Sequence, residues 1–259
     1  QIADTEHFRR ASIYQFNRSF PLARLHYLAI IERFPASANT PDALYQLGRG
    51  YILELNYHEA VKWFERVQSE FPENPLAETA LSQAASAYSR INKPKEAISR
   101  YQKLIEKHPD SDTLERAYLN IVDIERDLGE PTDALKMAQK TREAFKGELP
   151  EAIALFAQIR IKIAENNWAE ALNDLNELQK FSDLGGTRVP GGTNKNEIAF
   201  LRANALEQLG RYPEAVESYL SIPDGRAEYY GWRATERLKT LSLDEKSSGV
   251  INQKFGTLF

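Results

Sequence analysis

The side chains that could do chemistry are mainly carboxylates, and their arrangement predicts no catalytic pair. Glycoside hydrolysis needs two carboxylic acids on either side of one bond, with the pKa of one of them raised. Glu96, Asp123, Glu125 and Asp127 qualify by residue type, but they lie among many other charged residues on expected helical surfaces. No Gly-x-Ser-x-Gly nucleophile elbow is present either, so we expect no hydrolytic site.

The sequence holds four histidines and no cysteine, which limits metal binding and redox chemistry. The histidines are His7, His26, His58 and His108, and no two are spaced to share one helix face. Without cysteine, disulfides and thiolate catalysis are excluded. The glycine-rich stretch from Ser182 to Asn196 lacks the Gly-Lys-Ser/Thr ending of phosphate-binding loops, so we interpret it as a surface loop. We therefore predict no metal, no cofactor and no enzyme activity in this chain.

Composition favours an ordinary folded protein. Of 259 residues, 42% are hydrophobic and 27% are charged, and the net charge of -4 provides no basic field for nucleic acid. No apolar run approaches the roughly 20 residues needed to span a bilayer. Because the chain begins with Gln1, we expect a trimmed or mature chain from which a signal peptide has been removed. The lack of cysteine fits an oxidising compartment.

Small and bulky residues recur with a fixed period. Alanines stand 37 residues apart at Ala23, Ala60, Ala97, Ala134 and Ala171, and Ala215 follows after 44. Four residues after each alanine come Tyr27, Phe64, Tyr101, Ala138, Leu175 and Tyr219, and nine before the first five come Tyr14, Tyr51, Tyr88, Glu125 and Lys162. A small residue lets two helices cross closely, and the bulky one a turn later fills the same face. Pro35, Pro72 and Pro109 then end a helix. Such units cannot bury their apolar faces alone, so they must stack.

The second unit carries the residues of a known repeat family. Its landmarks are Leu44, Leu47, Gly48, Tyr51, Ala60, Phe64 and Pro72. With these, residues 41–72 resemble a tetratricopeptide repeat that has three extra residues per period. Units are expected near 4–37, 41–72, 78–109, 115–146, 152–182 and 196–223, and they match the family less well toward the C-terminus. The resemblance implies an all-α fold: an α-α superhelix over residues 1–225, built as a solenoid of about six helix-turn-helix repeats.

Residues 226–259 are expected to form a C-terminal capping helix near 226–241 and a tail or linker. The segment YLSIPDGRAEYYGWRATERL resembles the end of the N-terminal superhelical region of bacterial soluble lytic murein transglycosylases. That resemblance implies a periplasmic or envelope protein whose catalytic domain is absent from this chain. The family's catalytic Glu-Ser motif has no counterpart, since Glu217 and Ser218 fall within a repeat helix. The "FP" and "HP" unit endings are also similar to those of envelope assembly lipoproteins.

In the tetratricopeptide family, the first helices line a concave groove through the second, fifth, ninth, twelfth and thirteenth positions of each unit. These positions include Phe8 and Ser12 in the first unit. The predicted partner-binding residues are Tyr45, Arg49, Arg90, Asp123, Arg126, Phe156, Arg160, Phe200 and Asn204. Aromatic residues beside arginines are common interface anchors, although each could instead bond within the chain. No unit combines Lys at the fifth position with Asn at the ninth, so the chaperone-type carboxylate clamp is not expected.

Three functions follow from these patterns. The first is a non-catalytic scaffold that binds a protein or peptide along its groove, in the periplasm or bacterial cell envelope. The second is the superhelical domain of a peptidoglycan lytic transglycosylase, which would contact peptidoglycan through its parent enzyme. The third is a tetratricopeptide lipoprotein for outer-membrane assembly. None of them requires nucleic acid, a cofactor or a transmembrane segment, and the cytoplasm is the alternative location.

Overall fold

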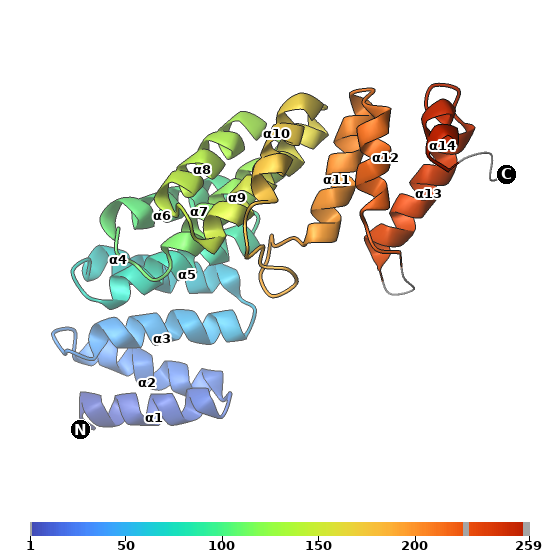
Figure 1. The fold of residues 1–259 in the computed structure, drawn as a ribbon. Helices are drawn as coiled ribbons and strands as arrows, with labels where there is room; N and C mark the ends of the chain where they lie inside the picture. Colours follow the sequence, from blue (N-terminus) through green and yellow to red (C-terminus); the bar gives the residue numbers. More distant parts are fainter. Residues whose placement is uncertain (1, 225–227, 256–259) are drawn as a thin grey trace. The chain divides into compact units, whose positions relative to one another are not determined.

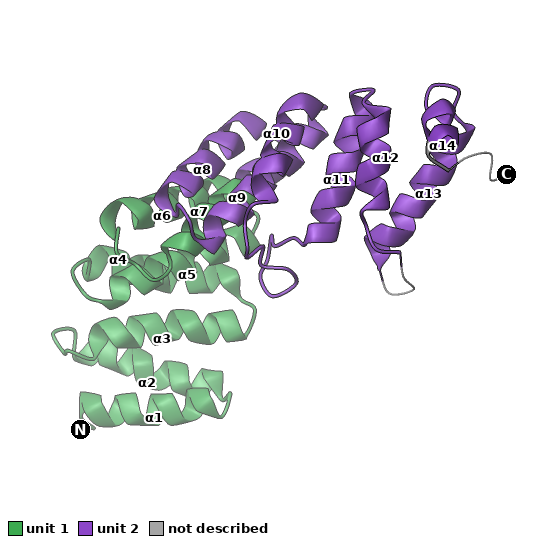
Figure 2. Cartoon of the chain, viewed as in Figure 1, with its two compact units in different colours: residues 1–124 green, residues 125–259 purple. Residues whose placement is uncertain are grey.

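The computed structural model describes residues 2–224 and 228–255, and this part of the chain is all-helical (Figure 1). It contains fourteen helices and no strand within those residues. Two compact units divide the chain, residues 1–124 (unit 1) and residues 125–259 (unit 2) (Figure 2). The predicted fold class, an all-α array of stacked helix pairs, is confirmed.

Consecutive helices pack against one another within each unit. Unit 1 contains α1 (Asp4–Phe16), α2 (Phe20–Arg33), α3 (Thr40–Leu53), α4 (Tyr57–Glu70), α5 (Leu76–Arg90) and α6 (Pro94–Lys107). The boundary between the units falls inside α7 (Leu114–Asp127). Unit 2 contains α8 (Pro131–Ala144), α9 (Leu149–Ala164), α10 (Trp168–Leu178), α11 (Lys195–Gln208), α12 (Tyr212–Leu220), α13 (Tyr229–Leu243) and α14 (Ser248–Phe255).

The link inside six successive helix pairs is the same backbone turn. The middle one of the three residues that link the two helices adopts a positive φ between 57° and 74°. These residues are Arg18, Leu55, Asn92, Gly129, Asn166 and Gly210. The backbone N–H of the residue that follows each of them donates to a carbonyl in the last turn of the first helix. Lys93, for example, donates to the Tyr88 carbonyl at 2.9 Å. This is the Schellman C-cap. Glycine and asparagine tolerate the left-handed conformation, whereas it costs other residues roughly 1–2 kcal/mol.

The repeated alanines and the bulky residues after them form the core. Ala60, Ala97 and Ala134 are each fully buried, as the stacking model requires. Phe64 is fully buried as well, and Gly48 lies so close to it that an added Cβ would stand 2.6 Å from the Phe64 Cε1 atom. That approach explains why the first helix needs a small residue at the crossing. Helix α2 ends at Arg33, two residues before Pro35, so the proline follows the helix end as predicted.

Two regions differ from the sequence prediction. Residues 248–255, predicted to belong to a tail, form α14, because Ile251 is buried in the apolar cluster of α9 to α13. The predicted start of the preceding helix at residue 226 lies outside the described residues; α13 begins at Tyr229. The glycine-rich insertion is also less open than predicted. Thr193 donates to the Leu184 carbonyl at 2.8 Å, and both side chains are buried.

Candidate functional site

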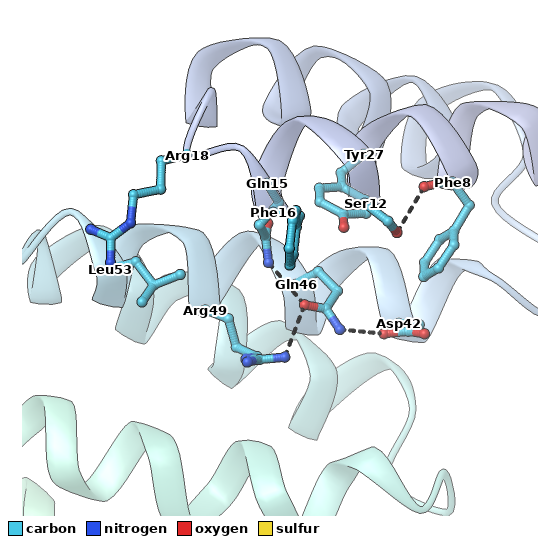
Figure 3. Close-up of a pocket in the computed structure, with 10 residues that line it drawn as sticks. All are labelled: Phe8, Ser12, Gln15, Phe16, Arg18, Tyr27, Asp42, Gln46, Arg49 and Leu53. Atoms are coloured by element: carbon cyan, nitrogen blue, oxygen red, sulfur yellow. Dashed lines mark hydrogen bonds between the residues drawn. The ribbon is translucent and has the colours of Figure 1, made fainter.

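A cleft of about 450 Å³ opens on unit 1 between the two first helices α1 and α3 (Figure 3). Its lining residues come from α1, the turn after it, one position on α2, and α3. They are Phe8, Ser12, Gln15, Phe16, Arg18, Tyr27, Asp42, Gln46, Arg49 and Leu53. Most occupy the second, fifth, ninth, twelfth or thirteenth positions of their repeat units.

The cleft is lined in part by apolar side chains that remain exposed to solvent. Phe16 is 89% exposed and Leu53 is 47% exposed, at the C-terminal ends of α1 and α3. Phe8 is half-buried and meets the ring of Tyr27 edge-on, with centroids 5.8 Å apart. One end of the cleft therefore has a packed pair of aromatic rings, and the other end has exposed apolar side chains.

A short hydrogen-bonded chain of amides joins α1 to α3 across the cleft. The Gln15 amide donates to Gln46 Oε1 at 3.0 Å, and the Gln46 amide donates to Asp42 Oδ1 at 3.1 Å. Arg49 Nη1 also donates to Gln46 Oε1, at 3.4 Å. On the α1 side, Ser12 Oγ donates to the Phe8 carbonyl at 3.0 Å. These bonds are visible as dashed lines in Figure 3. They fix the position of Gln46 between an acidic and a basic side chain.

The electrostatic environment keeps the buried tyrosine of the cleft protonated. Burial raises the pKa of the Tyr27 hydroxyl, while its hydrogen bond with Ser12 acts in the opposite direction. Asp42 raises the same pKa and Arg49 lowers it, so both charges act on this hydroxyl. Among the ten lining residues described, none form an acid–base or nucleophile–base pair.

The predicted aromatic contacts are mostly buried. Tyr45 is 9%, Phe156 is 4% and Phe200 is 6% exposed. Tyr45 packs against Phe64 with ring centroids 5.6 Å apart, and Phe200 packs against Tyr219 at the same distance. The reason is geometric: the fifth position of the first helix faces the bulky residue of its own second helix, 19 residues later. Phe8 and Tyr27 share this separation.

The predicted polar contacts lie nearer the surface. Arg49, Arg90, Asp123 and Arg160 are exposed. Arg126 is half-buried and pairs with Asp127 at 2.9 Å, and Asn204 is half-buried beside the Tyr219 hydroxyl. Of the nine predicted residues, Arg49 alone lines the cleft described here, together with Phe8 and Ser12. A role in partner binding stays a prediction for all nine.

The sequence prediction missed several cleft residues although their positions signalled them. Gln15 and Phe16 are the twelfth and thirteenth residues of the first repeat unit. Asp42 and Leu53 are the second and thirteenth residues of the second repeat unit. Arg18 had no sequence signal, because it belongs to a turn rather than to a groove-facing helix position.

The sequence prediction also missed a contact between two histidines. His7 Nδ1 and His26 Nδ1 lie 2.8 Å apart, between α1 and α2. Their separation is again 19 residues, so two facing helices bring together residues that share no helix face. His7 is buried, and no group among the described residues bonds to its Nε2. In the described part of the chain, no three histidine or acidic side chains gather as a metal site would require.

Comparison with known families now identifies the repeat. The model of the tetratricopeptide repeat matches residues 42–74 and 79–111. Both stretches are similar to tetratricopeptide repeats. They correspond to the second and third repeat units of the sequence. Both lie wholly in unit 1 of the structure, residues 1–124. The sequence matches none of the curated proteins with which it was compared.

Solved tetratricopeptide proteins share the fold over most of the chain. The C-terminal part of a TPR repeat-containing protein from Cytophaga hutchinsonii aligns with a TM-score of 0.64 and 14% identity, covering 96% of both chains. A tetratricopeptide repeat protein from Parabacteroides merdae aligns with a TM-score of 0.55 and 17% identity, also covering 96% of both. YrrB aligns with a TM-score of 0.54 and 15% identity, covering 81% of this chain and 97% of its own. At such identities the likeness concerns the fold.

These neighbours lend no support to the predicted resemblance to lytic transglycosylases. None of the structures reported above is an enzyme by its description. Among the helices described, none combines the length and the apolar character that crossing a bilayer demands.

Proposed function

We propose that this chain is a non-catalytic scaffold that binds an extended segment of a partner protein in the cleft between α1 and α3. The observation that carries the proposal is the cleft itself, where Phe16 and Leu53 stand exposed beside a bonded row of polar groups. Covering one such apolar side chain contributes about 1.5–3 kcal/mol. Micromolar affinity corresponds to a binding free energy of about 8 kcal/mol. A peptide that covers both side chains would therefore gain a large part of that free energy from this contact.

The shape of the cleft favours a peptide over a small molecule. It is an open trough between two parallel first helices rather than an enclosed cavity, and polar hydrogen-bonding groups line its length. YrrB, which shares the fold, is described as a TPR protein with an unusual peptide-binding site. Peptide recognition in a groove uses apolar pockets for anchoring and polar groups for register.

A matched set of aspartate substitutions tests the proposal. Phe16→Asp and Leu53→Asp should each weaken binding of selected peptides at least tenfold, because a charge replaces the apolar contact. Leu25→Asp is the control: Leu25 is 64% exposed on α2 and does not line the cleft. Peptides that bind the immobilised wild-type chain would be selected from a phage-displayed random library. Fluorescence anisotropy would then measure the Kd of each selected peptide for the wild-type chain and for each variant. Equal affinity for all three variants would contradict the proposal.

The finer parts of the sequence prediction remain proposals of different weight. Arg90, Asp123 and Arg160 are exposed and are retained as candidate contacts for the rest of a longer partner segment. The division into six repeat units and the location in the bacterial cell envelope stay predictions. A direct test of location is fractionation of cells that express the native gene.

A further inference from the structure

The charges around the cleft are separated along its length. Asp42 lies near the start of α3, beside Phe8, and Arg49 lies two turns further along the same helix. Arg18 follows the end of α1, near Leu53, so Figure 3 shows the acidic group at one end and the two arginines toward the other. Phe16 stands between these ends.

The charged groups of the cleft have hydrogen-bond donors and acceptors that no bond within the described part of the chain occupies. The Asp42 carboxylate is half-buried and accepts one bond from Gln46, at its Oδ1 atom. Arg49 makes a single long bond to a neutral amide oxygen. Within the described residues, neither Arg18 nor Arg49 forms an ion pair, whereas Arg24 in the same unit pairs with Glu54. The arginines of the cleft therefore still present most of their donors to a ligand.

The spacing of these charges defines a ligand. Seven residues of helix separate Asp42 from Arg49, which corresponds to about 10 Å at 1.5 Å per residue. A peptide in the extended polyproline II conformation rises about 3.1 Å per residue with three residues per turn, so side chains three positions apart lie on one face and would reach both ends. Resting on the proposed function, we propose that the cleft binds an extended segment with a basic and an acidic residue about three positions apart and an apolar residue between them. The basic residue pairs with Asp42, the acidic one with Arg49 and Arg18, and the apolar one covers Phe16.

Four capped, fluorescein-labelled peptides test this inference. Their central sequences are Lys-Ala-Phe-Glu, Glu-Ala-Phe-Lys, Gln-Ala-Phe-Gln and Lys-Ala-Phe-Lys, so that both chain directions of the charged pair are sampled. At least one of the two oppositely charged peptides should bind about tenfold tighter than the glutamine peptide. In the Asp42→Asn, Arg49→Gln double variant this preference should disappear.

Arg18 allows a test in which weaker binding cannot result from unfolding. Arg18 holds a φ of 57°, where the equivalent residues of the third to sixth helix pairs are asparagine or glycine. Arg18→Asn should therefore raise the urea midpoint of unfolding and yet weaken the oppositely charged peptide about threefold. Leu55→Asn is the matched control, because Leu55 has a φ of 61° and does not line the cleft. It should raise the midpoint and leave peptide affinity unchanged.

The outcomes separate this inference from the proposed function. If all four peptides bind equally and Phe16→Asp abolishes their binding, the charge pattern is wrong and the peptide-binding cleft stands. If none of the four peptides binds, the charge pattern is wrong, and the library-selected peptides decide the proposed function. If binding of the selected peptides is indifferent to Phe16→Asp, both proposals are wrong. A preference for opposite charges that survives the double variant also overturns the charge pattern, because Asp42 and Arg49 would not be its source.

Discussion

Units 1 and 2 build the same helix-pair turn with different side chains. In unit 1 the residue whose carbonyl closes the turn is aromatic, as at Tyr51 and Tyr88. In unit 2 the equivalent residues are Glu125, Lys162 and Leu206, yet the same N–H to carbonyl bonds form, at 3.0, 2.8 and 2.9 Å. The buried alanine nine residues later is present in both. The turn and the small residue thus suffice for the fold, and the aromatic residue is one of several ways to fill the space beside them.

The stretches that match the repeat family both keep the aromatic residue, Tyr51 or Tyr88. The matching stretches, residues 42–74 and 79–111, lie in the unit that keeps the aromatic residues. In unit 2 the space at Lys162 is filled by a charge pair: Lys162 Nζ lies 2.7 Å from Asp174 Oδ2, and both side chains are largely buried. Unit 1 is therefore expected to depend on apolar packing at these positions, and unit 2 on buried charge at Glu125 and Lys162. The four predictions below test that contrast.

The largest effect is expected in the apolar core of unit 1. Phe64→Ala should lower the free energy of unfolding by about 3–5 kcal/mol, because the fully buried ring contacts Tyr45 and Gly48 and leaves a cavity. The equivalent change in unit 2, Leu175→Ala, removes fewer atoms and should cost about 3 kcal/mol. Urea unfolding measures both totals, and hydrogen exchange assigns the loss to a unit.

Phe16→Ala is the control for this pair. Phe16 is 89% exposed, so its removal should change stability by no more than about 0.5 kcal/mol. A loss for Leu175→Ala larger than that for Phe64→Ala would contradict the view that unit 1 relies more on aromatic packing.

The next effect is expected at the buried charge pair of unit 2. Lys162→Ala should cost about 2 kcal/mol, because it leaves the carboxylate of Asp174 buried without its partner. The double change Lys162→Met, Asp174→Leu should restore wild-type stability or exceed it, since apolar residues of similar volume often replace buried ion pairs without loss. A double-mutant cycle in urea measures the coupling.

Lys136→Ala provides the exposed counterpart. Its pair with Asp133 spans 3.0 Å, but both side chains are more than half exposed, so the change should cost less than about 0.5 kcal/mol. Equal costs at Lys162 and Lys136 would show that burial of the pair has no energetic role.

The sequence alone predicted the fold better than the site, for a physical reason. Burial of Ala60 and Phe64 follows from helical period and side-chain size, which the sequence displays directly. Contacts between facing helices depend on which rotation each helix adopts, and this placed Tyr45 in the core although it was predicted to face a partner. The 19-residue separation that joins His7 to His26 becomes recognisable once Phe8 and Tyr27 are seen to share it.

A smaller, opposite effect is expected at Glu125. Burial, followed by the charges of Asp133 and Glu130, raises the pKa of this carboxyl, and no group among the described residues bonds to its Oε2. The folded state therefore binds a proton more tightly than the unfolded state, and ionisation at neutral pH lowers stability. Glu125→Gln should stabilise the chain by about 1 kcal/mol at pH 7.

The gain from Glu125→Gln should shrink as the pH falls through the raised pKa, since the wild-type carboxyl then becomes neutral as well. Glu245→Gln, at an exposed position, should leave stability unchanged across the same range. Thermal unfolding at pH 7 and pH 5 measures both, and a pH-independent gain at Glu125 would contradict burial of the charge as the cause.

The smallest predicted effect concerns the histidines, all four of which lie in unit 1. Burial lowers the pKa of His7, with further contributions from Arg33 and Arg10, and only Glu6 opposes them. Burial and then His7 lower the pKa of His26. The unfolded state therefore binds more protons, so stability is complete above the ordinary histidine pKa of about 6.5 and is lost as the pH falls below it. Protonation of both rings also removes the acceptor of their hydrogen bond.

Between pH 7 and pH 5.5, unit 1 should lose hydrogen-exchange protection in α1 and α2, while unit 2 should hold or gain protection because Glu125 changes in the opposite sense. Replacing both members of the pair, His7→Phe with His26→Gln, should flatten the response of unit 1 by removing the titrating groups. His58→Asn serves as the control, since His58 is exposed on α4 and lies outside the pair. If the two units lost protection in parallel on acidification, the acid response would not originate at the histidines, and the contrast between an aromatic unit 1 and a charge-filled unit 2 would not extend to pH.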